Sequence, residues 1–461
     1  MIRLFKHYIS YNVVLLSLID FVLLALAGEA AWRLRVAQIG VSVGDFSDRA
    51  LELGGFAAVV WLAIIAVGTY GPEALRSIRF ATARLLVAVS LGVLAISLMN
   101  LLLPGSALWR SVLLYAMVIA IVLLVLNRLL AGRMLGVEAF RRTIVVLGAG
   151  ERAARLRALS HRRDSGFTIG GFVAMGDSPA TIETAVPRES ITDLGQFVER
   201  VGATEVVLAL QERRNSLPLK DLLKVKTKGV YVNDFSSFLE RETGRVDLDT
   251  LNPSWLIFSD GFSAGRRLSG IGKRLFDIVV SLAILVIGLP LIVVFAILVK
   301  LESKGPAFFR QTRVGLYGQS FEILKLRSMR IDAEASGAKW AEKDDPRITR
   351  VGKLIRKVRI DELPQVWSVL KGEMSFVGPR PEVPAFVVDL DKALPFYAER
   401  HVVKPGITGW AQINYPYGAS IEDARHKLEY DLYYAKNYTP FLDILILLQT
   451  ARVILWPDGA R

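Results

Sequence analysis

The chain has 461 residues, of which 52% are hydrophobic and only 22% are charged, and its mean hydropathy is +0.39. So apolar a composition excludes an intrinsically disordered or collagen-like protein and predicts contact with lipid, and the length predicts more than one domain. The net charge of +13 favours anionic partners such as lipid headgroups or phosphorylated substrates, and the absence of cysteine excludes disulfides, iron–sulfur clusters and thiolate metal sites.

The first third of the chain contains long segments without charge. No charged residue occurs in 53–72, 85–109 or 111–127. Each of these segments approaches or exceeds the ~20 residues that a helix needs to cross a bilayer. A fourth apolar segment, 9–27, is interrupted only by Asp20. The sequence therefore predicts a bundle of four transmembrane helices.

Basic residues at the ends of these segments predict their orientation. Basic residues precede the segment 9–27, lie between 53–72 and 85–109, and follow 111–127. The connection between 85–109 and 111–127 carries only Arg110. The consistent interpretation is a transmembrane region over residues 1–135 with four crossings and both ends in the cytoplasm. Asp20 is then either a functional intramembrane acid or, as we expect, faces the bundle interior and pairs with a neighbouring helix.

The pattern then changes to that of a Rossmann-like α/β domain, predicted over residues 140–260. A strand-like run at 143–147 is followed by Gly148-Ala149-Gly150 and a helical segment. Glycines in such a loop bring the backbone close to a phosphate at a helix N-terminus. However, the match is only G-x-G-x-x-A, and the acid Asp177 follows later than is usual. Gly148 and Gly150 are therefore a weak nucleotide loop, and we favour a regulatory or structural module.

A further uncharged segment opens the last third of the chain. It is long enough to cross a bilayer, and an ordinary crossing would carry everything after it to the far side. Yet Lys273 and Arg274 precede the segment and Lys304 follows it, which predicts that both ends face the cytoplasm. Pro290 lies near its middle and interrupts helical hydrogen bonding. We predict a re-entrant membrane helix over about 275–300, with an ordinary kinked crossing as the alternative.

Basic residues gather in three clusters after this segment. We expect them to bind phosphate or anionic lipid, since they lie close in sequence to a membrane-inserting segment; a solvated helix face is the alternative. Nucleic acid is not an expected partner of so apolar a chain. The candidates are Arg310, Arg313, Lys325, Arg327, Arg347 and Arg359.

Two adjacent acids, Asp361 and Glu362, directly follow these clusters. Pro364 fits only the first turn of a helix, so the pair is predicted at or just before a helix N-terminus, where amide groups and the helix dipole favour carboxylates and attract phosphate. A carboxylate nucleophile beside a second carboxylate for a metal suits phosphoryl transfer with Mg²⁺. Helix capping is the alternative role of the pair.

Ordered motifs fill the chain from Lys273 to about Leu455, and this part closely resembles the bacterial sugar transferases, which are polyprenyl-phosphate hexose-1-phosphate transferases. The resemblance implies a catalytic domain over residues 270–461. The membrane helices and the Rossmann-like domain ahead of it resemble those of the large family members. The motifs are Lys273-Arg-Leu-Phe-Asp277, Arg310-Gln-Thr-Arg-Val-Gly315, Lys325-Leu-Arg-Ser-Met329, Asp345-Pro-Arg-Ile-Thr349, Arg359-Ile-Asp-Glu-Leu-Pro-Gln365, Gly372-Glu-Met-Ser-Phe-Val-Gly-Pro-Arg-Pro-Glu382, Pro405-Gly-Ile-Thr-Gly-Trp-Ala-Gln412 and Asp431-Leu-Tyr-Tyr434.

The resemblance implies a reaction and assigns roles. A UDP-sugar gives its hexose-1-phosphate to undecaprenyl phosphate and UMP is released, in the first membrane step of exopolysaccharide or O-antigen repeat-unit synthesis. Asp361 forms a covalent phosphosugar intermediate, and Glu362 helps to bind Mg²⁺. Phosphate binding or completion of the site falls on further residues, for which fold-supporting ion pairs and packing are the alternative. These residues are Arg347, Arg359, Arg380, Asp431 and Tyr434.

The resemblance also implies a setting for the enzyme. It predicts a multi-pass protein of the bacterial inner membrane, with a mainly α-helical catalytic domain on the cytoplasmic face, and a homodimer is plausible. Two other classes compete with this interpretation: a membrane-bound nucleotide-sugar-modifying Rossmann enzyme and a non-catalytic polysaccharide export partner. The first needs a Tyr-x-x-x-Lys pair, and none of the 13 tyrosines has lysine four residues later. The second leaves the acid pair and its surrounding polar motifs without a role.

Overall fold

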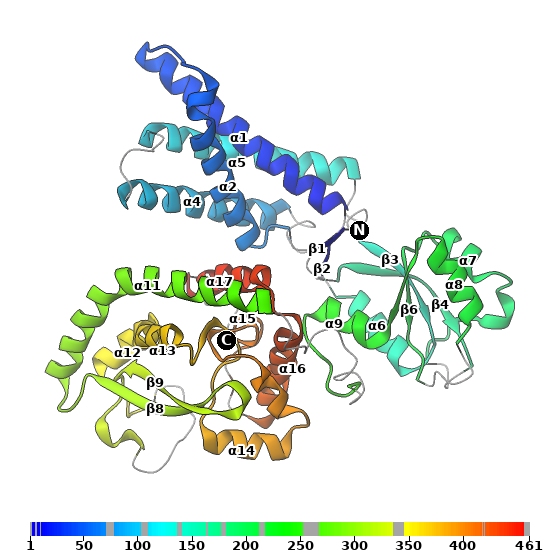
Figure 1. Ribbon diagram of the computed structural model, residues 1–461. Coiled ribbons are helices and arrows are strands. Elements are labelled where there is room, and N and C mark those ends of the chain that lie inside the picture. The colour runs from blue at the N-terminus through cyan, green and yellow to red at the C-terminus, as the bar shows by residue number, and fades with distance from the viewer. Residues whose placement is uncertain are drawn as a thin grey trace. The chain divides into compact units, whose positions relative to one another are not determined.

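The computed structural model places the chain in two compact units, Met1–Glu242 and Thr243–Arg461 (Figure 1). In the first unit a helical bundle precedes an α/β domain, and the second unit carries the acid pair. The structure describes residues 2–4, 7–9, 11–70, 78–102, 109–135, 141–162, 165–176, 181–211, 217–251, 267–334, 345–416, 418 and 420–455.

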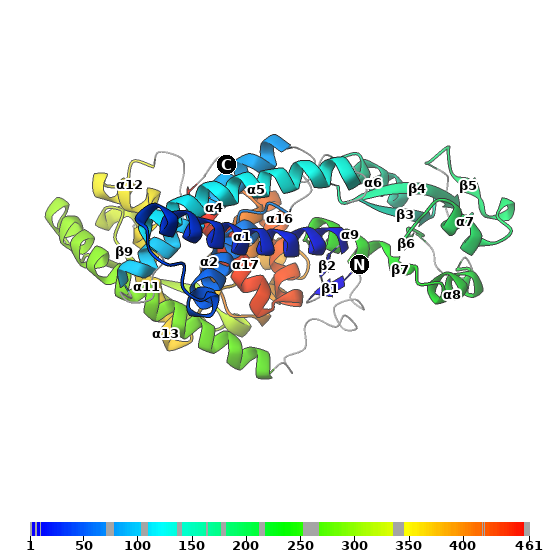
Figure 2. The same ribbon diagram turned by 90° about the horizontal axis from the view of Figure 1, so that it is seen from above.

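Four long helices form the N-terminal bundle, in which α1 and α4 each pack against α2 and α5 (Figure 1, Figure 2). By length and hydropathy α1, α2 and α5 can each cross a bilayer, whereas the apolar part of α4, Ala81–Ser97, is shorter. These helices make the chain a membrane protein. The elements are β1 (Ile2–Leu4), β2 (His7–Ile9), α1 (Tyr11–Ile39), α2 (Phe46–Ala66), α4 (Ile78–Leu102) and α5 (Arg110–Leu135).

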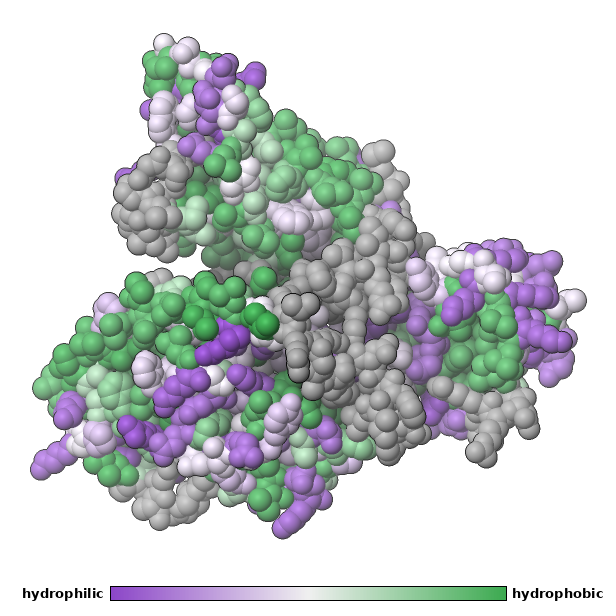
Figure 3. Space-filling view, in the orientation of Figure 1, coloured by the Kyte–Doolittle hydropathy of each residue, from purple (hydrophilic) through white to green (hydrophobic). Residues whose placement is uncertain are grey.

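The outer surface of the bundle is apolar. On α5, Leu114, Val118, Val122 and Leu126 recur every four residues and are between 48% and 59% exposed. In Figure 3 apolar side chains also cover much of the visible surface of the bundle below its hydrophilic upper end. A large contiguous apolar surface on a helical bundle is stable in contact with lipid and not in contact with water.

Asp20 lies inside the bundle with no exposed surface. Its carboxylate accepts hydrogen bonds from Asn127 at 2.8 Å and from Arg128 at 2.6 Å, both on α5, and from the hydroxyl of Tyr70 at 2.7 Å. A charge in this position is stable only when it is paired and hydrogen bonded. The expectation that Asp20 pairs with a neighbouring helix is confirmed, and the pair joins α1 to α5.

The α/β domain is built on a five-stranded parallel sheet with the order β5-β4-β3-β6-β7. The first strand, β3, lies in the middle and the chain winds outward to both edges, so a Rossmann-like domain is confirmed. Its elements are β3 (Arg142–Leu147), α6 (Glu151–Ser160), β4 (Phe167–Ala174), β5 (Val186–Pro187), η2 (Arg188–Ser190), α7 (Leu194–Arg200), β6 (Glu205–Leu208), α8 (Leu219–Thr227), β7 (Tyr231–Asp234) and α9 (Phe235–Thr243).

The glycine loop connects β3 to α6. Gly148 has a φ of +126°, and a Cβ added to it would come within 2.7 Å of the carbonyl oxygen of Ala209. The carbonyl of Ala149 accepts hydrogen bonds from the backbone N–H groups of Thr181 and Ile182. Close packing against protein backbone therefore accounts for Gly148 without a ligand. Asp177 lies outside the described residues.

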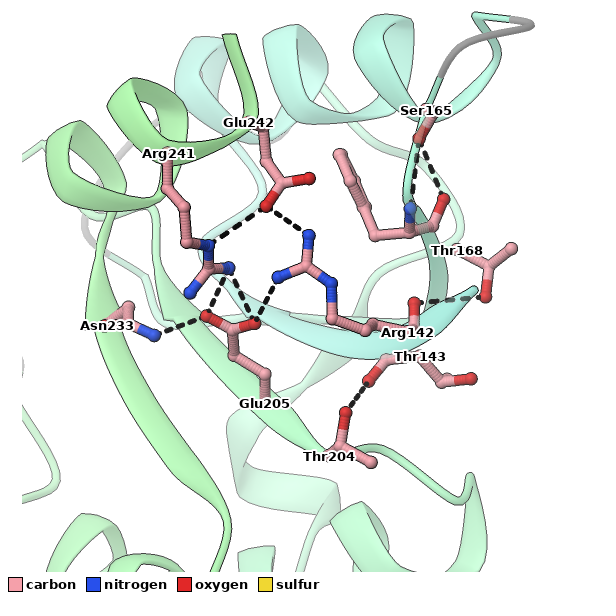
Figure 4. Close-up of polar contacts among 10 residues, drawn as sticks. Arg142, Thr143, Ser165, Thr168, Thr204, Glu205, Asn233, Arg241 and Glu242 are labelled. Carbon is pink, nitrogen blue, oxygen red and sulfur yellow. Dashed lines mark hydrogen bonds and ion pairs between the residues drawn. The ribbon is translucent and has the colours of Figure 1, made fainter. Parts of the chain in front are cut away.

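A buried ion network joins the two ends of this domain (Figure 4). Glu205, at the start of β6, is fully buried and receives two hydrogen bonds of 2.8 Å from Arg241 on α9. Glu242 bridges Arg241 and Arg142, and Arg142 is the first residue of β3. Since buried charges are stable only when compensated, the network holds the first strand and the last helix of the domain together.

The second unit is mainly helical and contains two small sheets, an antiparallel pair of β8 with β9 and a parallel pair of β10 with β11. Its elements are α11 (Arg267–Glu302), β8 (Phe308–Val314), η3 (Leu316–Gly318), β9 (Ser320–Leu326), η4 (Ile331–Glu334), α12 (Arg350–Lys357), η5 (Ile360–Gln365), α13 (Val366–Lys371), β10 (Ser375–Val377), α14 (Pro384–Ala393), η6 (Tyr397–Val402), β11 (Gly406–Thr408), α15 (Trp410–Asn414), α16 (Ile421–Asn437) and α17 (Pro440–Leu455).

This unit starts earlier than the predicted boundary at residue 270. The carbonyl of Gly244 accepts a hydrogen bond of 2.7 Å from the Trp410 indole, and the N–H of Val246 donates to Glu429 at 3.0 Å. Val246 and Leu248 are buried in the same core as α16 and α17. Residues that the sequence pattern placed at the end of the Rossmann-like domain therefore belong to the core of the second unit.

Helix α11 is bent by 55° between Gly270–Val286 and Gly288–Glu302. The bend coincides with Pro290, which has no N–H to donate to the carbonyl of Val286. A Cβ added to Gly288 would contact Leu363 of η5 at 3.5 Å. The bend therefore packs directly against the turn that carries the acid pair.

The N-terminal end of α11 is bonded to the rest of the second unit. Lys273 donates to the carboxylate of Asp443 on α17 at 2.6 Å and to the carbonyl of Val377 at 3.0 Å. The guanidinium of Arg274 donates to carbonyls at the end of α13, and Asp277 accepts hydrogen bonds of 2.9 Å from residues of β10. All three charged residues of the Lys273–Asp277 motif thus hold the helix on the domain.

The C-terminal end of α11 is bonded to the same unit. Arg327, just after β9, donates to the carbonyls of Ser303 and Lys304 at 2.9 Å and 2.8 Å. The carboxylate of Glu302 accepts from the backbone N–H of Arg350, at the start of α12, at 2.7 Å. Both ends of α11 are therefore attached to one compact unit.

Candidate active site

The acid pair lies in the first turn of the 3₁₀ helix η5, which leads directly into α13. The residue before the turn, Arg359, has a φ of 58°. This left-handed conformation costs a non-glycine residue roughly 1–3 kcal/mol and is typical of functional sites. The pair was predicted at a helix N-terminus, and the structure makes that helix a 3₁₀ turn held between β9 and α11.

Glu362 is surrounded by three cations. Its Oε1 lies 3.0 Å from Arg380, 3.7 Å from Lys325 and 3.8 Å from Arg359. Burial by itself would raise the pKa of Glu362, but the charges of these three residues outweigh it and lower the pKa to about 2. Glu362 is therefore ionised at neutral pH, and its charge lies among the three cations.

Lys325 brings a buried cation to the pair from β9. Burial lowers the pKa of Lys325 to about 8, and the neighbouring charge of Arg380 acts in the same direction. Glu362 opposes this shift without cancelling it. When the pH is close to the lowered pKa of a buried lysine, a phosphate that binds beside it stabilises the charged ammonium form. Such a lysine is typical of an anion-binding site.

Asp361 differs from its neighbour in its hydrogen bonding and in the direction of its pKa shift. The residue is 8% exposed, and its Oδ1 has no hydrogen-bond partner among the described residues. Burial raises the pKa of Asp361 and the charge of Glu362 adds to the effect, while Lys325, Arg356 and Arg359 oppose it. Buried carboxylate oxygens are normally hydrogen bonded. An unpartnered one beside several cations is suited to attack, or to ligate, a bound phosphate.

The other predicted phosphate-binding residues do not meet the acid pair in the same way. Arg310 is 75% exposed on the β8–β9 hairpin, 3.9 Å from Glu322. Arg313 donates to the carbonyl of Pro381 at 3.0 Å. Arg327 holds the end of α11, and Arg347 binds the carboxylate of Asp345 at 2.6 Å. Of the predicted phosphate-binding residues, all of which are described, Lys325, Arg359 and Arg380 thus converge on Glu362.

Asp431 and Tyr434 are buried in α16. Asp431 is 2% exposed and forms an ion pair of 2.7 Å with Arg400. The hydroxyl of Tyr434 accepts from Lys273 at 3.0 Å and lies 2.7 Å from Asp443. Both residues thus make buried, fold-supporting contacts, and their part in completing the site stays a prediction.

Arg400 and Asp443 were not identified from the sequence. Asp443 is the one charge in the apolar run 440–449, and this was a signal that could have marked it. Arg400 gave no comparable signal, because its charged partner Asp431 and the Arg380 carbonyl lie 31 and 20 residues away in the chain.

The carboxylates fit magnesium only in part. Among the described residues no group of three or more histidine, aspartate or glutamate side chains is arranged to hold a metal. Mg²⁺ commonly takes one or two carboxylates together with water and substrate phosphates, and the unpartnered oxygen of Asp361 suits such a role. The Oε1 of Glu362 already lies within 3.8 Å of all three cations. The donor set therefore fits an ion only where a bound phosphate supplies further ligands.

Two protein families match parts of the chain. The family described as bacterial sugar transferase matches residues 268–457, and the family described as CoA-binding domain matches residues 65–225. The first match contains η5 and all of α11 except its first residue, and the second begins in α2 and extends into the α/β domain.

Curated relatives match mainly the second unit. A UDP-N-acetylgalactosamine-undecaprenyl-phosphate N-acetylgalactosaminephosphotransferase of Aeromonas hydrophila is 47% identical over 222 residues, 48% of this chain and 52% of that protein. A UDP-glucose:undecaprenyl-phosphate glucose-1-phosphate transferase of Caulobacter vibrioides is 40% identical over 190 residues, 41% of this chain and 71% of that protein. An uncharacterised sugar transferase of Bacillus subtilis is 42% identical over 193 residues, 41% of this chain and 90% of that protein. The chain thus spans about half the length of the Aeromonas relative.

Proposed function

Because this chain belongs to the bacterial sugar transferase family, we propose that it transfers a hexose-1-phosphate from a UDP-sugar to undecaprenyl phosphate and releases UMP. The product, undecaprenyl-diphosphate-sugar, is the first membrane-bound intermediate of an exopolysaccharide or O-antigen repeat unit. One observation carries the proposal: the unpartnered, buried oxygen of Asp361 lies beside a glutamate that holds three cations. The names of the Aeromonas and Caulobacter relatives describe the same class of reaction.

In the first step the Asp361 carboxylate attacks the β-phosphorus of the UDP-sugar. A bond forms between this phosphorus and Asp361, the bond to the bridging oxygen breaks, and UMP leaves with the electron pair. Lys325 and Arg380 compensate the charge of the diphosphate, and Glu362 fixes their positions. Bound Mg²⁺, held by the carboxylates and the substrate phosphates, would supply further charge neutralisation.

In the second step a phosphate oxygen of undecaprenyl phosphate attacks the phosphorus of the phosphosugar on Asp361. The new diphosphate bond forms, the bond between the phosphorus and Asp361 breaks, and the free carboxylate is restored. Neither step needs a proton donor, because both leaving groups depart as anions. The cations around Glu362 therefore contribute by stabilising the negative charge on the phosphates.

The assay for this function is UMP release by the detergent-purified protein. We expect release with undecaprenyl phosphate, Mg²⁺ and one member of a panel of UDP-sugars, and we expect a lipid-linked sugar to accumulate in equal amount. Absence of UMP with every sugar in the panel would exclude the proposed reaction.

We further propose that α11 is re-entrant, that four bundle helices cross a bacterial inner membrane, and that the second unit lies on the cytoplasmic face. Both ends of α11 bond to the same unit, and one compact unit cannot lie on both sides of a bilayer. The 55° bend near Pro290 supports a helix that enters and returns.

Cysteine labelling tests this topology, and the chain has no native cysteine to interfere. Lys304→Cys is expected to resist a membrane-impermeant maleimide in intact spheroplasts and to react after permeabilisation. Ser42→Cys, in the exposed connection between α1 and α2, is the matched control and should react in intact spheroplasts. Labelling of Lys304→Cys without permeabilisation would contradict the re-entrant helix.

The pH profile of kcat/KM tests the role of Lys325. Its pKa is lowered to about 8, so the ammonium loses its proton as the pH rises through that value, and kcat/KM should fall about tenfold per pH unit above it. On the acidic side activity should fall as Asp361, whose pKa is raised, becomes protonated. Lys325→Arg keeps its charge at high pH and should move the alkaline limb upward while leaving the acidic limb in place. An identical alkaline limb in both proteins would exclude Lys325 as its origin.

A further inference from the structure

We propose that Arg400 and Asp431 are positioning residues, which fix the main chain at Arg380 so that its guanidinium meets Glu362 and the donor phosphate. The inference rests on the proposed function and deepens it. It places Asp431 beneath the phosphate-binding arginine instead of in contact with the substrate.

The Arg400–Asp431 pair is deeply buried. Arg400 lies in η6 and is 4% exposed, and Asp431 lies in α16 and is 2% exposed. The Nε and Nη2 atoms of Arg400 donate to Oδ2 of Asp431 at 3.0 Å and 2.7 Å, and Nη1 donates to the hydroxyl of Tyr397 at 3.1 Å. A buried guanidinium is tolerated only where its partners are in place, so this geometry is tightly determined.

The same guanidinium holds the backbone of the active site. Its Nη2 donates to the carbonyl of Arg380 at 2.9 Å. Arg380 lies between Pro379 and Pro381, which fix their own φ angles, and Pro381 favours an extended conformation for the residue before it. Every carbonyl from 379 to 382 accepts a hydrogen bond, in order from Gly406 N at 2.9 Å, Arg400 Nη2 at 2.9 Å, Arg313 Nη1 at 3.0 Å and Val314 N at 3.0 Å.

From this fixed backbone the side chain of Arg380 extends to Glu362, with 3.0 Å between Nη2 and Oε1 and with 32% of the side chain exposed. A partly exposed arginine side chain can adopt many rotamers. A fixed main chain at Arg380 narrows the range of positions that its guanidinium can reach. Displacement of a positioning group by about 1 Å can cost roughly 100-fold in rate. Loss of the buried Arg400–Asp431 pair should therefore weaken the contact between Arg380 and the donor phosphate.

The first test compares Asp431→Asn with Glu429→Gln in the full chain. Glu429 is a matched control because it lies on the same helix, is 4% exposed and pairs with Arg245 at 3.1 Å. We expect Asp431→Asn to lower kcat/KM for the UDP-sugar by roughly 10–100-fold, and Glu429→Gln to keep the wild-type value. Equal losses in both variants would overturn the proposal, since they would report general destabilisation.

The second test is a double-mutant cycle with Arg380→Ala. If Asp431 acts through Arg380, Asp431→Asn should cause no further loss of kcat/KM in the Arg380→Ala protein. A full further loss there would overturn the proposal. Arg400→Lys, which keeps the charge but cannot donate to Asp431, Tyr397 and Arg380 together, serves in the same cycle if Asp431→Asn fails to fold.

The Kd for UDP, measured by calorimetry, gives the cycle a readout without turnover. We expect Asp431→Asn to weaken UDP binding about tenfold in the wild-type background and not at all in Arg380→Ala, because the lost contact is that of Arg380. A wild-type protein that binds UDP but releases no UMP would contradict the proposed function, and the cycle in Kd would still decide the positioning role.

Discussion

Asp361→Asn is expected to reduce UMP release by roughly 10³–10⁶-fold, the range found when a catalytic nucleophile is removed. The amide oxygen of asparagine carries no full charge and cannot form the acyl phosphate. Asparagine has nearly the same shape as aspartate. Burial disfavours the charged form of Asp361 and so raises its pKa, and a neutral side chain at this position should leave the protein folded. The measurement is UMP release, with thermal unfolding as the check on folding.

The covalent intermediate gives this prediction a second readout. With a UDP-sugar labelled in its β-phosphate and no undecaprenyl phosphate, the wild-type protein should retain label, and Asp361→Asn should not. Asp389→Asn, at an exposed position on α14, is the control and should label normally. Near-normal turnover or label on Asp361→Asn would exclude Asp361 as the nucleophile.

Lys273→Met should destabilise the second unit by roughly 3–5 kcal/mol, because it leaves Asp443, whose side chain is 1% exposed, without its cation. Tyr434 would lose a hydrogen bond at the same time. In detergent this corresponds to a fall in Tm of roughly 6–20 °C, at about 2–4 °C per kcal/mol for a unit of this size. Lys304→Met, at an exposed position past the other end of α11, should change Tm little.

A double variant distinguishes an anchor from a topology signal. If Lys273 acts by neutralising Asp443, then Lys273→Met with Asp443→Leu should recover much of the lost stability, since an apolar pair can replace a buried ion pair. If Lys273 acts only as a positive charge on the cytoplasmic flank, the double variant should be no more stable than Lys273→Met. The second result would contradict the anchoring role.

The sequence by itself determined the features that depend on local patterns. Uncharged runs of bilayer length predicted the apolar helices, and strand-like runs separated by helical segments predicted the parallel sheet. Pro290 marked the bend in α11, because a missing N–H acts on the helix that contains it. Asp20, a single acid in an apolar segment, could be assigned a buried partner without knowing which residue that was. Asp361 and Glu362 are adjacent in the sequence, so they could be recognised as a pair without knowledge of the fold.

Only the tertiary structure decided which cations meet the acid pair. Lys325 and Arg380 come from separate segments on either side of η5, while Arg310, Arg313 and Arg327, equally plausible from composition, bond elsewhere. The structure also pairs Asp431 with Arg400, and the second compact unit begins at Thr243. The physical reason is that a charge pattern records which residues can pair, whereas the packing of distant segments sets which of them lie within 4 Å, and that packing leaves no periodic trace in the sequence.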